Sequence, residues 1–441
     1  MKDFKNYTSV FSWRYGSEEM RKIFSEENKY KLWRKIWVAL ARAEAKTGLV
    51  SKEELSDLEK NESNIDIERI WEIEKDTAHD VVAAIKEFAE KAKIGGGKIH
   101  LGATSMDISD NAETIRILKA LNLIEENLKK LLKEFAAKIE KYADTPCMGY
   151  THLQPAEPTT LGYRFAFYAQ DLLLDLELLQ FVKKNLKSKG IKGAVGTSAS
   201  YVNLLDEEKA VMLETEVMKD LEIEAAPITN QTSPRKIEFW VANLLASVAQ
   251  SLCKFAFDLR IMQSPGFGEW QEPFGKNQVG SSAMPFKKNP IKSEQICSLA
   301  RLVVNLSRVS WDNASHMLLE RTLDDSANRR VVVPEMFLSV DEMLSSAIKI
   351  ASGLIINNEQ ISQNLNKYWI QSMSEVIMVK LVQKGMNRQK AHELLRKIAM
   401  EGGDPRKELS KDDSDSIMDA KNHIGNAPQK ALELAGKIKK L

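Results

Sequence analysis

The chain has 441 residues, of which 43% are hydrophobic and 28% are charged, so it can bury a large core in two or three packing units. Lysine plus arginine (63) nearly balance aspartate plus glutamate (62), which excludes the strongly basic character of a nonspecific nucleic-acid or membrane binder. The first residues contain no apolar run long enough for a signal peptide or a membrane span. Together with three cysteines that read as reduced core thiols, this predicts a cytoplasmic protein.

Helical periodicity starts near Ser17 and continues with few interruptions, which leaves little room for strands. Apolar residues at helix spacing predict a helix over residues 25–46 that ends at Gly48. Ser51 and Glu54 have the spacing of a capping box, which predicts that the next helix begins there.

Three domains are expected from the way these patterns change along the chain. An apolar stripe over residues 81–88 is followed by three consecutive glycines, which predict a hinge. We expect an N-terminal helical domain over residues 1–108, a central long-helix domain over residues 109–358 and a helical C-terminal domain over residues 359–441. The predicted helices of the last two domains span residues 111–142, 159–187, 234–263, 290–316, 334–350, 374–384 and 387–400, the last one capped by Asn387.

The predicted fold class is all-α. The helix over residues 111–142 would be about 48 Å long at a rise of roughly 1.5 Å per residue, and it carries apolar residues on more than one side. The helix over residues 159–187 is apolar over most of its circumference. Because such helices lie inside a bundle or pack against another subunit, we expect a central bundle that assembles into an oligomer. The run at residues 190–200, rich in Gly and Ser, predicts an exposed loop.

The loop at residues 280–290 combines more chemical features than any other stretch of the chain. Gly280 permits positive φ, and two prolines exclude a continuous helix. Two serines offer hydroxyls and backbone amides, and Lys287 and Lys288 add positive charge, so the loop suits an anion. Asn289 and the proline after it have the pattern of a helix cap, which would point a helix N-terminus at the same anion. On spacing alone, a connector with a solvated lysine pair explains the pattern equally well.

Three of the six histidines lie in junctions between predicted helices. His152 belongs to residues 149–160, where two prolines prevent a helix. His79 precedes a predicted helix, and His100 precedes the turn at residues 104–105, whose hydroxyls and amides suit a carboxylate. Imidazole titrates near neutral pH and can transfer protons. Taken alone, a loop histidine is more often solvated or a cap, and the turn is equally well an ordinary N-cap cluster.

Two further polar junctions carry candidate binding residues. Residues 319–330 combine three arginines with a hydroxyl in a stretch that reads as helix-breaking, and arginine suits phosphate because it donates paired N–H groups. Residues 229–236 contain Ser233 and Pro234, which have the pattern of a helix start. A solvated charged turn and a plain cap are the alternatives for these segments.

The loop at residues 280–290 resembles the signature of the fumarase/aspartase superfamily, lyases that eliminate fumarate from a succinyl group. The other junctions resemble further blocks of the same superfamily, in the same order, from Arg14 to beyond Met400. The signature reads Gly280-Ser281-Ser282-Ala283-Met284-Pro285-Phe286-Lys287-Lys288-Asn289-Pro290.

This resemblance implies a homotetramer with a multi-helix core, shared active sites and elimination by general acid and base catalysis. Ser282 would be the base and His152 the acid. Glu294 would orient His152, and His79 or His100 would assist it. A proton beside a carboxylate is very weakly acidic, so preorganised donors such as Lys287 must stabilise the charge that its removal creates.

The arginine-rich segment resembles the branch of the superfamily that acts on phosphorylated succinyl nucleotides, which implies small-molecule nucleotide substrates. Nucleic acid and membranes are not expected as partners. No metal or organic cofactor is expected, because no metal-ligand spacing or Gly-x-Gly-x-x-Gly motif occurs. The alternatives are another fumarate-releasing lyase, similar to argininosuccinate lyase, and a noncatalytic helical scaffold. The implied substrate-binding residues are Arg14, Tyr15, Asp80, His100, Thr104, Ser105, Thr151, Gln231, Asn289, Arg321, Ser326 and Arg330.

Overall fold

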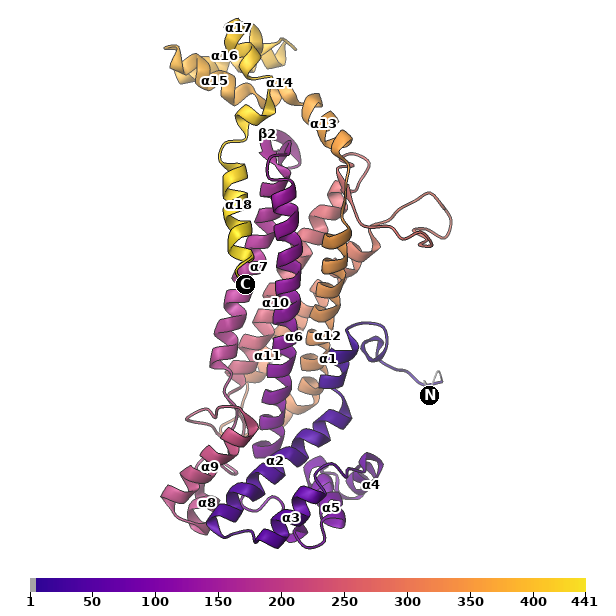
Figure 1. Cartoon of the computed structure of the whole chain (residues 1–441), viewed down its shortest axis with the longest axis vertical. Coiled ribbons are helices and arrows are strands. Elements are labelled where there is room, and N and C mark those ends of the chain that lie inside the picture. Colours follow the sequence, from indigo (N-terminus) through magenta and orange to yellow (C-terminus); the bar gives the residue numbers. More distant parts are fainter. Residues whose placement is uncertain (1–4) are drawn as a thin grey trace. The chain divides into compact units, whose positions relative to one another are not determined.

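The computed structural model describes residues 5–441, and this part of the chain contains eighteen α-helices and four short strands (Figure 1). The all-α fold class is therefore confirmed. The chain divides into two compact units, while the three-domain division stays a prediction. Unit 1 consists of Met1–Glu125, Glu177–Ala249 and Leu299–Glu342, and unit 2 consists of Glu126–Leu176, Gln250–Ser298 and Met343–Leu441.

The first helices of unit 1 begin and end where local signals predict. Ser25 accepts a hydrogen bond from the N–H of Asn28, and Gly48 ends the same helix in the left-handed region with φ 85°. The predicted capping box of Ser51 and Glu54 is confirmed. These helices are α1 (Glu18–Ile23), α2 (Glu26–Thr47), α3 (Lys52–Lys60), α4 (Ile67–Thr77) and α5 (Asp80–Lys91), with 3-10 turns at Val10–Ser12 and Gly96–Lys98.

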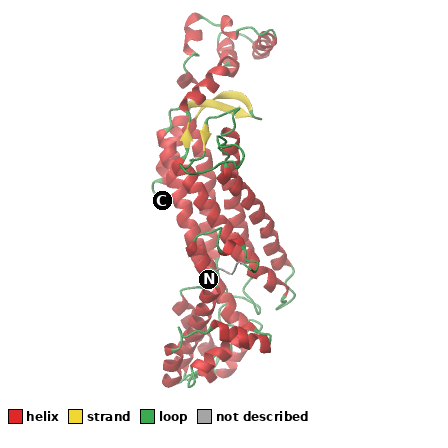
Figure 2. Ribbon diagram, turned by 90° about the vertical axis from the view of Figure 1, so that its right-hand side faces the viewer, coloured by secondary structure: helices red, strands yellow, loops and turns green. Residues whose placement is uncertain are grey.

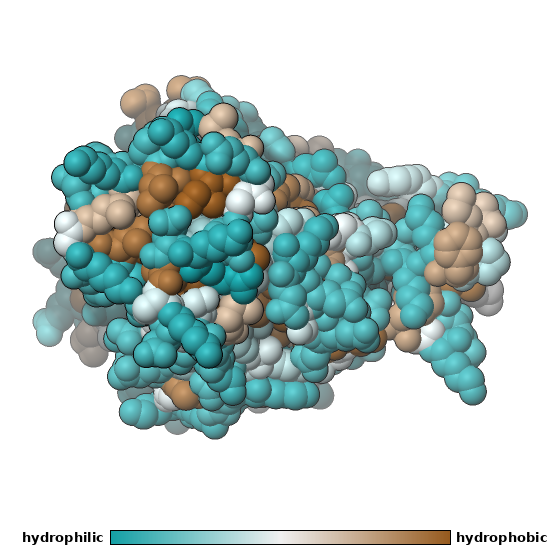
Figure 3. Space-filling view, turned by 90° about the horizontal axis from the view of Figure 1, so that it is seen from above, coloured by the Kyte–Doolittle hydropathy of each residue, from teal (hydrophilic) through white to brown (hydrophobic). Residues whose placement is uncertain are grey.

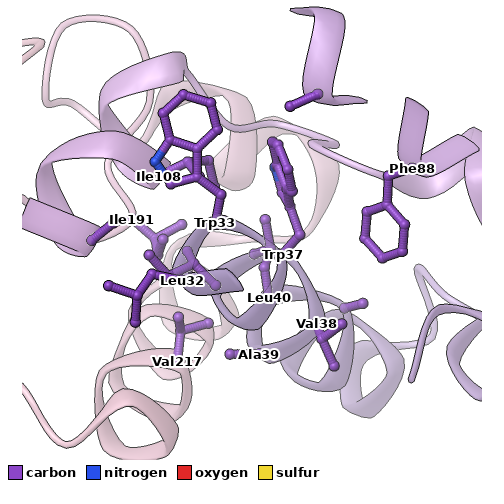
Figure 4. Packing of buried hydrophobic residues seen from close by; sticks show 14 of the residues in the cluster. Leu32, Trp33, Trp37, Val38, Ala39, Leu40, Phe88, Ile108, Ile191 and Val217 are labelled. Carbon is purple, nitrogen blue, oxygen red and sulfur yellow. The ribbon is translucent and has the colours of Figure 1, made fainter. Parts of the chain in front are cut away.

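Helix α2 lies at the centre of the core of unit 1. Its Trp33 and Trp37 pack edge to face, and Trp37 contacts Phe88 of α5 (Figure 4). Arg34 and Glu87 form an ion pair that is almost fully buried, and the Arg34 guanidinium lies over the Phe88 ring. Because this core joins α2 and α5, it fixes the helix N-terminus that carries His79.

Five long helices follow along the chain. They are α6 (Ser105–Lys141), α7 (Leu161–Asn185), α10 (Arg235–Met262), α11 (Ile291–Ser315) and α12 (Asp324–Gly353). Helix α6 begins at Ser105 rather than at residue 111. Helix α12 begins at Asp324, so the prediction that it starts at Pro334 is wrong, and so is the helix-breaking interpretation of residues 324–330. A proline removes one backbone hydrogen bond, but the residues after Pro334, including the buried Phe337, continue to pack as a helix.

The loop after α7 is buried in its first half. Residues 190–193 lie in the core, so the prediction of an exposed loop is wrong for them and right for most of residues 194–200. The Asn111 amide donates to the Gly190 carbonyl and accepts from the Gly190 N–H, both at 3.0 Å, which satisfies backbone groups that would otherwise need water. Two short helices follow, α8 (Ala199–Leu204) and α9 (Glu207–Leu221).

Unit 2 contains a β-hairpin that the sequence analysis did not anticipate. Strands β1 (Pro146–Thr151) and β2 (Gln154–Thr160) pair antiparallel and appear in yellow in Figure 2. Strand β3 (Trp270–Gln271) pairs with β4 (Ile355–Ile356). Asn387 caps α16 as predicted. The C-terminal helices are α13 (Asn358–Lys367), α14 (Trp369–Ser372), α15 (Ser374–Gln383), α16 (Arg388–Met400), α17 (Lys411–Ser416) and α18 (Ala427–Ile438), with 3-10 turns at Pro405–Glu408 and Ala420–His423.

Candidate active site

A cavity of about 430 Å³ in unit 1 collects residues that the sequence analysis singled out from widely separated segments. Its walls come from α2, the junction of α4 and α5, the start of α6, the segment before α10 and the start of α12. For brevity we call it the unit 1 cavity. The sequence-predicted residues that line it are His79, Asp80, Ser105, Gln231, Arg321, Ser326 and Arg330.

One wall of the unit 1 cavity is the N-terminus of α5. His79 is the N-cap, and its Nδ1 accepts a hydrogen bond of 3.4 Å from the N–H of Val82. The carboxylate of Asp80 accepts from the N–H of Val81 at 2.8 Å and from an Nη of Arg330 at 2.8 Å. Arg330 is largely exposed, so this ion pair is solvent-screened and weak. A ligand phosphate can therefore replace Asp80 as the acceptor of Arg330 at little cost.

The three arginines of residues 319–330 have different surroundings. Arg321 is mostly buried and donates to the buried Asp325 at 2.9 Å. Arg329 is paired with Glu238, and although burial disfavours its charge, Glu238 and Asp110 outweigh burial and raise its pKa. Arg329 is thus held in the fold, whereas Arg321 and Arg330 have donors that can reach a ligand.

A strained turn precedes α6. His100 and Gly102 both have positive φ, 69° and 71°. The indole N–H of Trp37 donates to Nδ1 of His100 at 3.1 Å, which leaves the proton of a neutral imidazole on Nε2. Burial lowers the pKa of His100, with Asp107 opposing the effect, so the neutral form is favoured. Thr104 is fixed because its N–H donates to the Asp107 carboxylate at 2.9 Å.

In unit 2, His152 lies at the tip of the β1–β2 hairpin. His152 and Leu153 are the two turn residues between the strands, and both have positive φ, 54° and 61°. This conformation costs energy in residues other than Gly, Asn and Asp, and such strain concentrates at functional sites. Both side chains are exposed and border a cavity of about 510 Å³ lined by aromatic rings of α7. Thr151 lines a separate cavity between β2 and the start of α15.

The loop at residues 280–290 is open to solvent in the single chain, and Ser282 and Lys287 are both exposed. Its conformation is held at its ends. The N–H of Met284 donates to the Ser281 hydroxyl at 3.1 Å, and the amide of Asn289 donates to the Gly280 carbonyl at 2.8 Å. The serine and lysine side chains of the loop are therefore available to a ligand or to a neighbouring subunit.

The predicted cap at Asn289 is wrong, because its side chain closes the loop instead of capping α11. Glu272 takes that place: its buried carboxylate accepts from the N–H of Lys292 at 3.2 Å and from the N–H of Ser293 at 2.5 Å. The N-terminus of α11 is thus already satisfied by a protein anion and does not point free N–H groups at a ligand. Glu294, in the first turn of α11, is exposed.

Several sequence-predicted residues do not line the unit 1 cavity. Arg14 lies over the rings of its neighbours Trp13 and Tyr15, at 5.7 and 5.8 Å from their centroids. Within residues 5–441, no hydrogen bond or ion pair joins His152 to Glu294 or to Ser282. The predicted residues outside this cavity are Arg14, Tyr15, His100, Thr104, Thr151, His152, Ser282, Lys287, Asn289 and Glu294.

Sequence reasoning missed the buried residues that hold the ligand-facing side chains and turns in place. Asp107 accepts from Thr104 and also pairs with the fully buried Lys189 at 2.9 Å. Asp325 and Arg235 belong to a buried charge cluster beside the cavity. An aspartate in a polar junction gives no sequence signal that separates a buried partner from a solvated one, so these roles become visible only in the fold.

Comparisons with known proteins identify the class. A family model described as Lyase matches residues 14–305. The adenylosuccinate lyase of Schistosoma mansoni is 38% identical over 407 residues, which cover 91% of this chain and 84% of that protein. The adenylosuccinate lyase of Pyrococcus abyssi is 40% identical, with 88% and 85% covered, and that of Saccharomyces cerevisiae is 36% identical, with 99% and 95% covered. The chain therefore belongs to the fumarase/aspartase superfamily of lyases and, within it, to the adenylosuccinate lyase family.

Solved structures agree on the fold. A fumarate lyase from Mesorhizobium sp. BNC1 has a TM-score of 0.85 at 24% identity, with 98% of this chain and 99% of that chain covered. The 3-carboxy-cis,cis-muconate lactonizing enzyme from Pseudomonas putida has a TM-score of 0.87 at 25% identity, with the same coverage. Because these two proteins are named for different reactions, the fold alone does not identify the substrate.

Two further properties of residues 5–441 bear on partners. Only Arg235–Met262 is a helix long and apolar enough to cross a membrane, and 56% of its apolar window is buried in the fold, as in core helices of soluble proteins. Within the same described residues, no group of three His, Cys, Asp or Glu side chains is placed to hold a metal ion.

Proposed function

We propose that this protein releases fumarate from adenylosuccinate to give AMP, and from the succinylated aminoimidazole carboxamide ribotide of purine synthesis to give the free carboxamide ribotide. The observation that carries the proposal is the unit 1 cavity, in which Arg321, Ser326 and Arg330 gather around a space suited to a phosphate. The names of the curated relatives supply the substrate. One site can serve both compounds because both carry the same scissile carbon–nitrogen bond and a ribose phosphate.

In the proposed mechanism, Ser282 removes a proton from the carbon next to a succinyl carboxylate. The carbon–nitrogen bond then breaks, its electrons leave with the nitrogen, and His152 donates a proton to that nitrogen. Fumarate forms as the new carbon–carbon double bond closes. The exposed Lys287 and the amides of its loop would stabilise the doubly negative intermediate, which is the most demanding step. The exposed Glu294 would orient His152.

The remaining residues divide by the part of the substrate that they would hold. Arg14 and Tyr15 would join the cavity arginines at the phosphate. The turn with Thr104 and Ser105 would bind a succinyl carboxylate, with its rigid backbone fixed by Asp107. Because His100 carries its proton on Nε2, it would donate a hydrogen bond, and His79 would assist the acid. The others proposed to contact the substrate are Asp80, Thr151, Gln231 and Asn289.

We further propose that the active protein is a cytoplasmic homotetramer with active sites shared between subunits. The unit 1 cavity contains neither His152 nor Ser282, and in this proposal acid and base come from neighbouring chains. Hydrophobic side chains remain exposed on the long helices. Brown hydrophobic residues also lie between hydrophilic ones on the end of the molecule that Figure 3 shows from above. The exposed side chains on the long helices include Tyr163, Phe167, Leu174 and Phe181 of α7, Phe257 of α10, and Val304 and Trp311 of α11.

Fumarate release tests the proposed reaction. The wild-type protein should release fumarate from adenylosuccinate and from the succinylated carboxamide ribotide, but not from argininosuccinate, which has no phosphate for Arg321 and Arg330. Release from argininosuccinate alone would show that the protein is a lyase similar to argininosuccinate lyase. If none of the three compounds released fumarate, the protein would be the noncatalytic helical scaffold.

Subunit mixing tests the shared site. His152→Ala and Ser282→Ala should each lower kcat by about 10² to 10⁴. Mixed oligomers of the two variants should regain activity, because some sites then combine an intact acid with an intact base. If oligomers that demonstrably contain both variants remain inactive, active sites are not shared between subunits.

A further inference from the structure

A cluster of buried charged side chains adjoins the unit 1 cavity and is not explained by ligand binding alone. Its central members are almost inaccessible to solvent: the side chain of Asp325 is 0% exposed, and those of Arg235 and Asp110 are 2% exposed. Burying ions is costly unless each is paired and hydrogen-bonded, and the charges of this cluster are paired with one another. Arg235, Arg329 and Arg321 balance Asp110, Asp325 and Glu238.

Asp325 is the bridge between the cluster and the cavity. One carboxylate oxygen accepts from an Nη of Arg321 at 2.9 Å, and the other accepts from Nε of Arg235 at 2.8 Å. No other acceptor for the Arg321 guanidinium occurs within residues 5–441. Asp325 thus anchors one Nη of a guanidinium that lines the cavity and leaves its remaining N–H groups for a ligand.

Arg235 extends the bridge to the segment that carries Gln231. Its Nη1 donates to the Ser233 hydroxyl at 2.9 Å and to Asp110 at 3.0 Å, and Asp110 also accepts from the N–H of Ser233 at 2.8 Å. The Gln231 N–H donates to the Glu320 carbonyl at 3.2 Å. Residues 230–233 are therefore connected to the segment before α12 by a backbone hydrogen bond and by the buried ion pairs of Arg235.

We propose that Asp325 is a positioning residue that holds Arg321 and, through Arg235, the Gln231 segment as one rigid element of the phosphate end of the site. The inference rests on the proposed function, in which Arg321 contacts the substrate phosphate. Arg330 differs from Arg321, because its side chain is exposed and Asp80 is its only carboxylate partner within residues 5–441. Arg321 is held in place before the ligand arrives, whereas Arg330 changes partner when the ligand arrives.

The first test is Asp325→Asn, which keeps the shape but turns one acceptor into a donor facing an arginine. The KM for adenylosuccinate should rise about ten- to a hundredfold, since misplacing a binding group by a fraction of an ångström has effects of this size, while kcat changes little. Succinyladenosine, which lacks the phosphate, should lose nothing in kcat/KM. Asp324→Asn is the matched control, because Asp324 is the exposed neighbour and carries the same charge.

A double-mutant cycle with Arg321→Gln separates positioning from general stability. If Asp325 acts mainly through Arg321, Asp325→Asn should raise KM less once Arg321 is replaced, because only the part of its effect that runs through Arg235 remains. Equal effects of Asp325→Asn in both backgrounds, or an equal loss on succinyladenosine, would overturn the proposal. If Asp325→Asn does not fold, as judged by circular dichroism, Asp325→Glu enters the same cycle, because the longer side chain cannot bridge both arginines.

Binding of inorganic phosphate, measured by calorimetry, keeps this test independent of the reaction. Its affinity should fall about tenfold or more in Asp325→Asn and should be unchanged in Asp324→Asn. A wild-type protein that releases no fumarate from adenylosuccinate would refute the proposed function only. Equal phosphate affinity of wild type and Asp325→Asn would refute the role of Asp325.

Discussion

Glu44 makes the stability of this protein depend on pH in a direction opposite to that of most carboxylates. Its side chain on α2 is 1% exposed, and one of its oxygens has no hydrogen-bond partner within residues 5–441. Burial raises the pKa of Glu44 from 4.5 to about 8, with Lys98 opposing the effect. Between these values the folded chain keeps a proton that the unfolded chain has released. The stability associated with Glu44 is therefore complete below pH 4.5 and declines as pH rises towards 8.

The size of this effect follows from the two values. At pH 7 the solution lies about 2.5 pH units above the unfolded value, and each unit corresponds to about 1.4 kcal/mol, so the loss is about 3 kcal/mol. Glu44→Gln presents a neutral group of the same shape at every pH. The variant should therefore gain about 3 kcal/mol of unfolding free energy relative to wild type as pH is raised from about 4.5 to 7.

Urea unfolding followed by tryptophan fluorescence, between about pH 4.5 and 8, measures this gain. The protein concentration is held fixed, because the stability of an oligomer depends on concentration. Glu27→Gln is the control: it lies on the same helix, but its side chain is exposed and paired with Lys31. If the unfolding free energies of wild type and Glu44→Gln change with pH in parallel across this range, Glu44 is charged in the folded chain. That result would refute the reasoning.

Two other substitutions test the supports of the candidate site. Gly102→Ala should lower both the melting temperature and kcat/KM, because Gly102 has φ 71° and a new Cβ would lie 2.8 Å from the Tyr201 ring. Gly97→Ala, where a Cβ meets no atom within 4 Å, should be nearly neutral, and equal effects of the two would contradict this account. Glu272→Gln should reduce the unfolding free energy by about 1 to 2 kcal/mol in urea, because it removes the carboxylate that caps α11. An unchanged midpoint would mean that water satisfies the same N–H groups.

Sequence reasoning succeeded where structure is set by neighbours in the chain. The caps at Ser51 and Asn387 and the helix end at Gly48 depend on hydrogen bonds or dihedral angles within a few residues, so local patterns predict them. The prediction at Pro334 was wrong because packing on both sides of the proline keeps the helix intact.

The unforeseen parts depend on partners distant in sequence. Residues 190–193 have the composition of an exposed loop, yet Asp107 and Asn111 of α6 accept and donate the hydrogen bonds that allow their burial. The same limitation explains the site. Motifs indicated Arg321 and Gln231, but only the fold reveals that Asp325 connects them.

The unit 1 cavity draws its walls from segments that extend from Phe24 to Pro334. During synthesis, the polar side chains of the early segments therefore cannot contact their partners until most of the chain has been made. Contacts of such long sequence separation form late and slowly. A phosphorylated ligand would thus bind this cavity only after unit 1 has folded. A ligand present during folding would stabilise the folded state relative to partly folded intermediates.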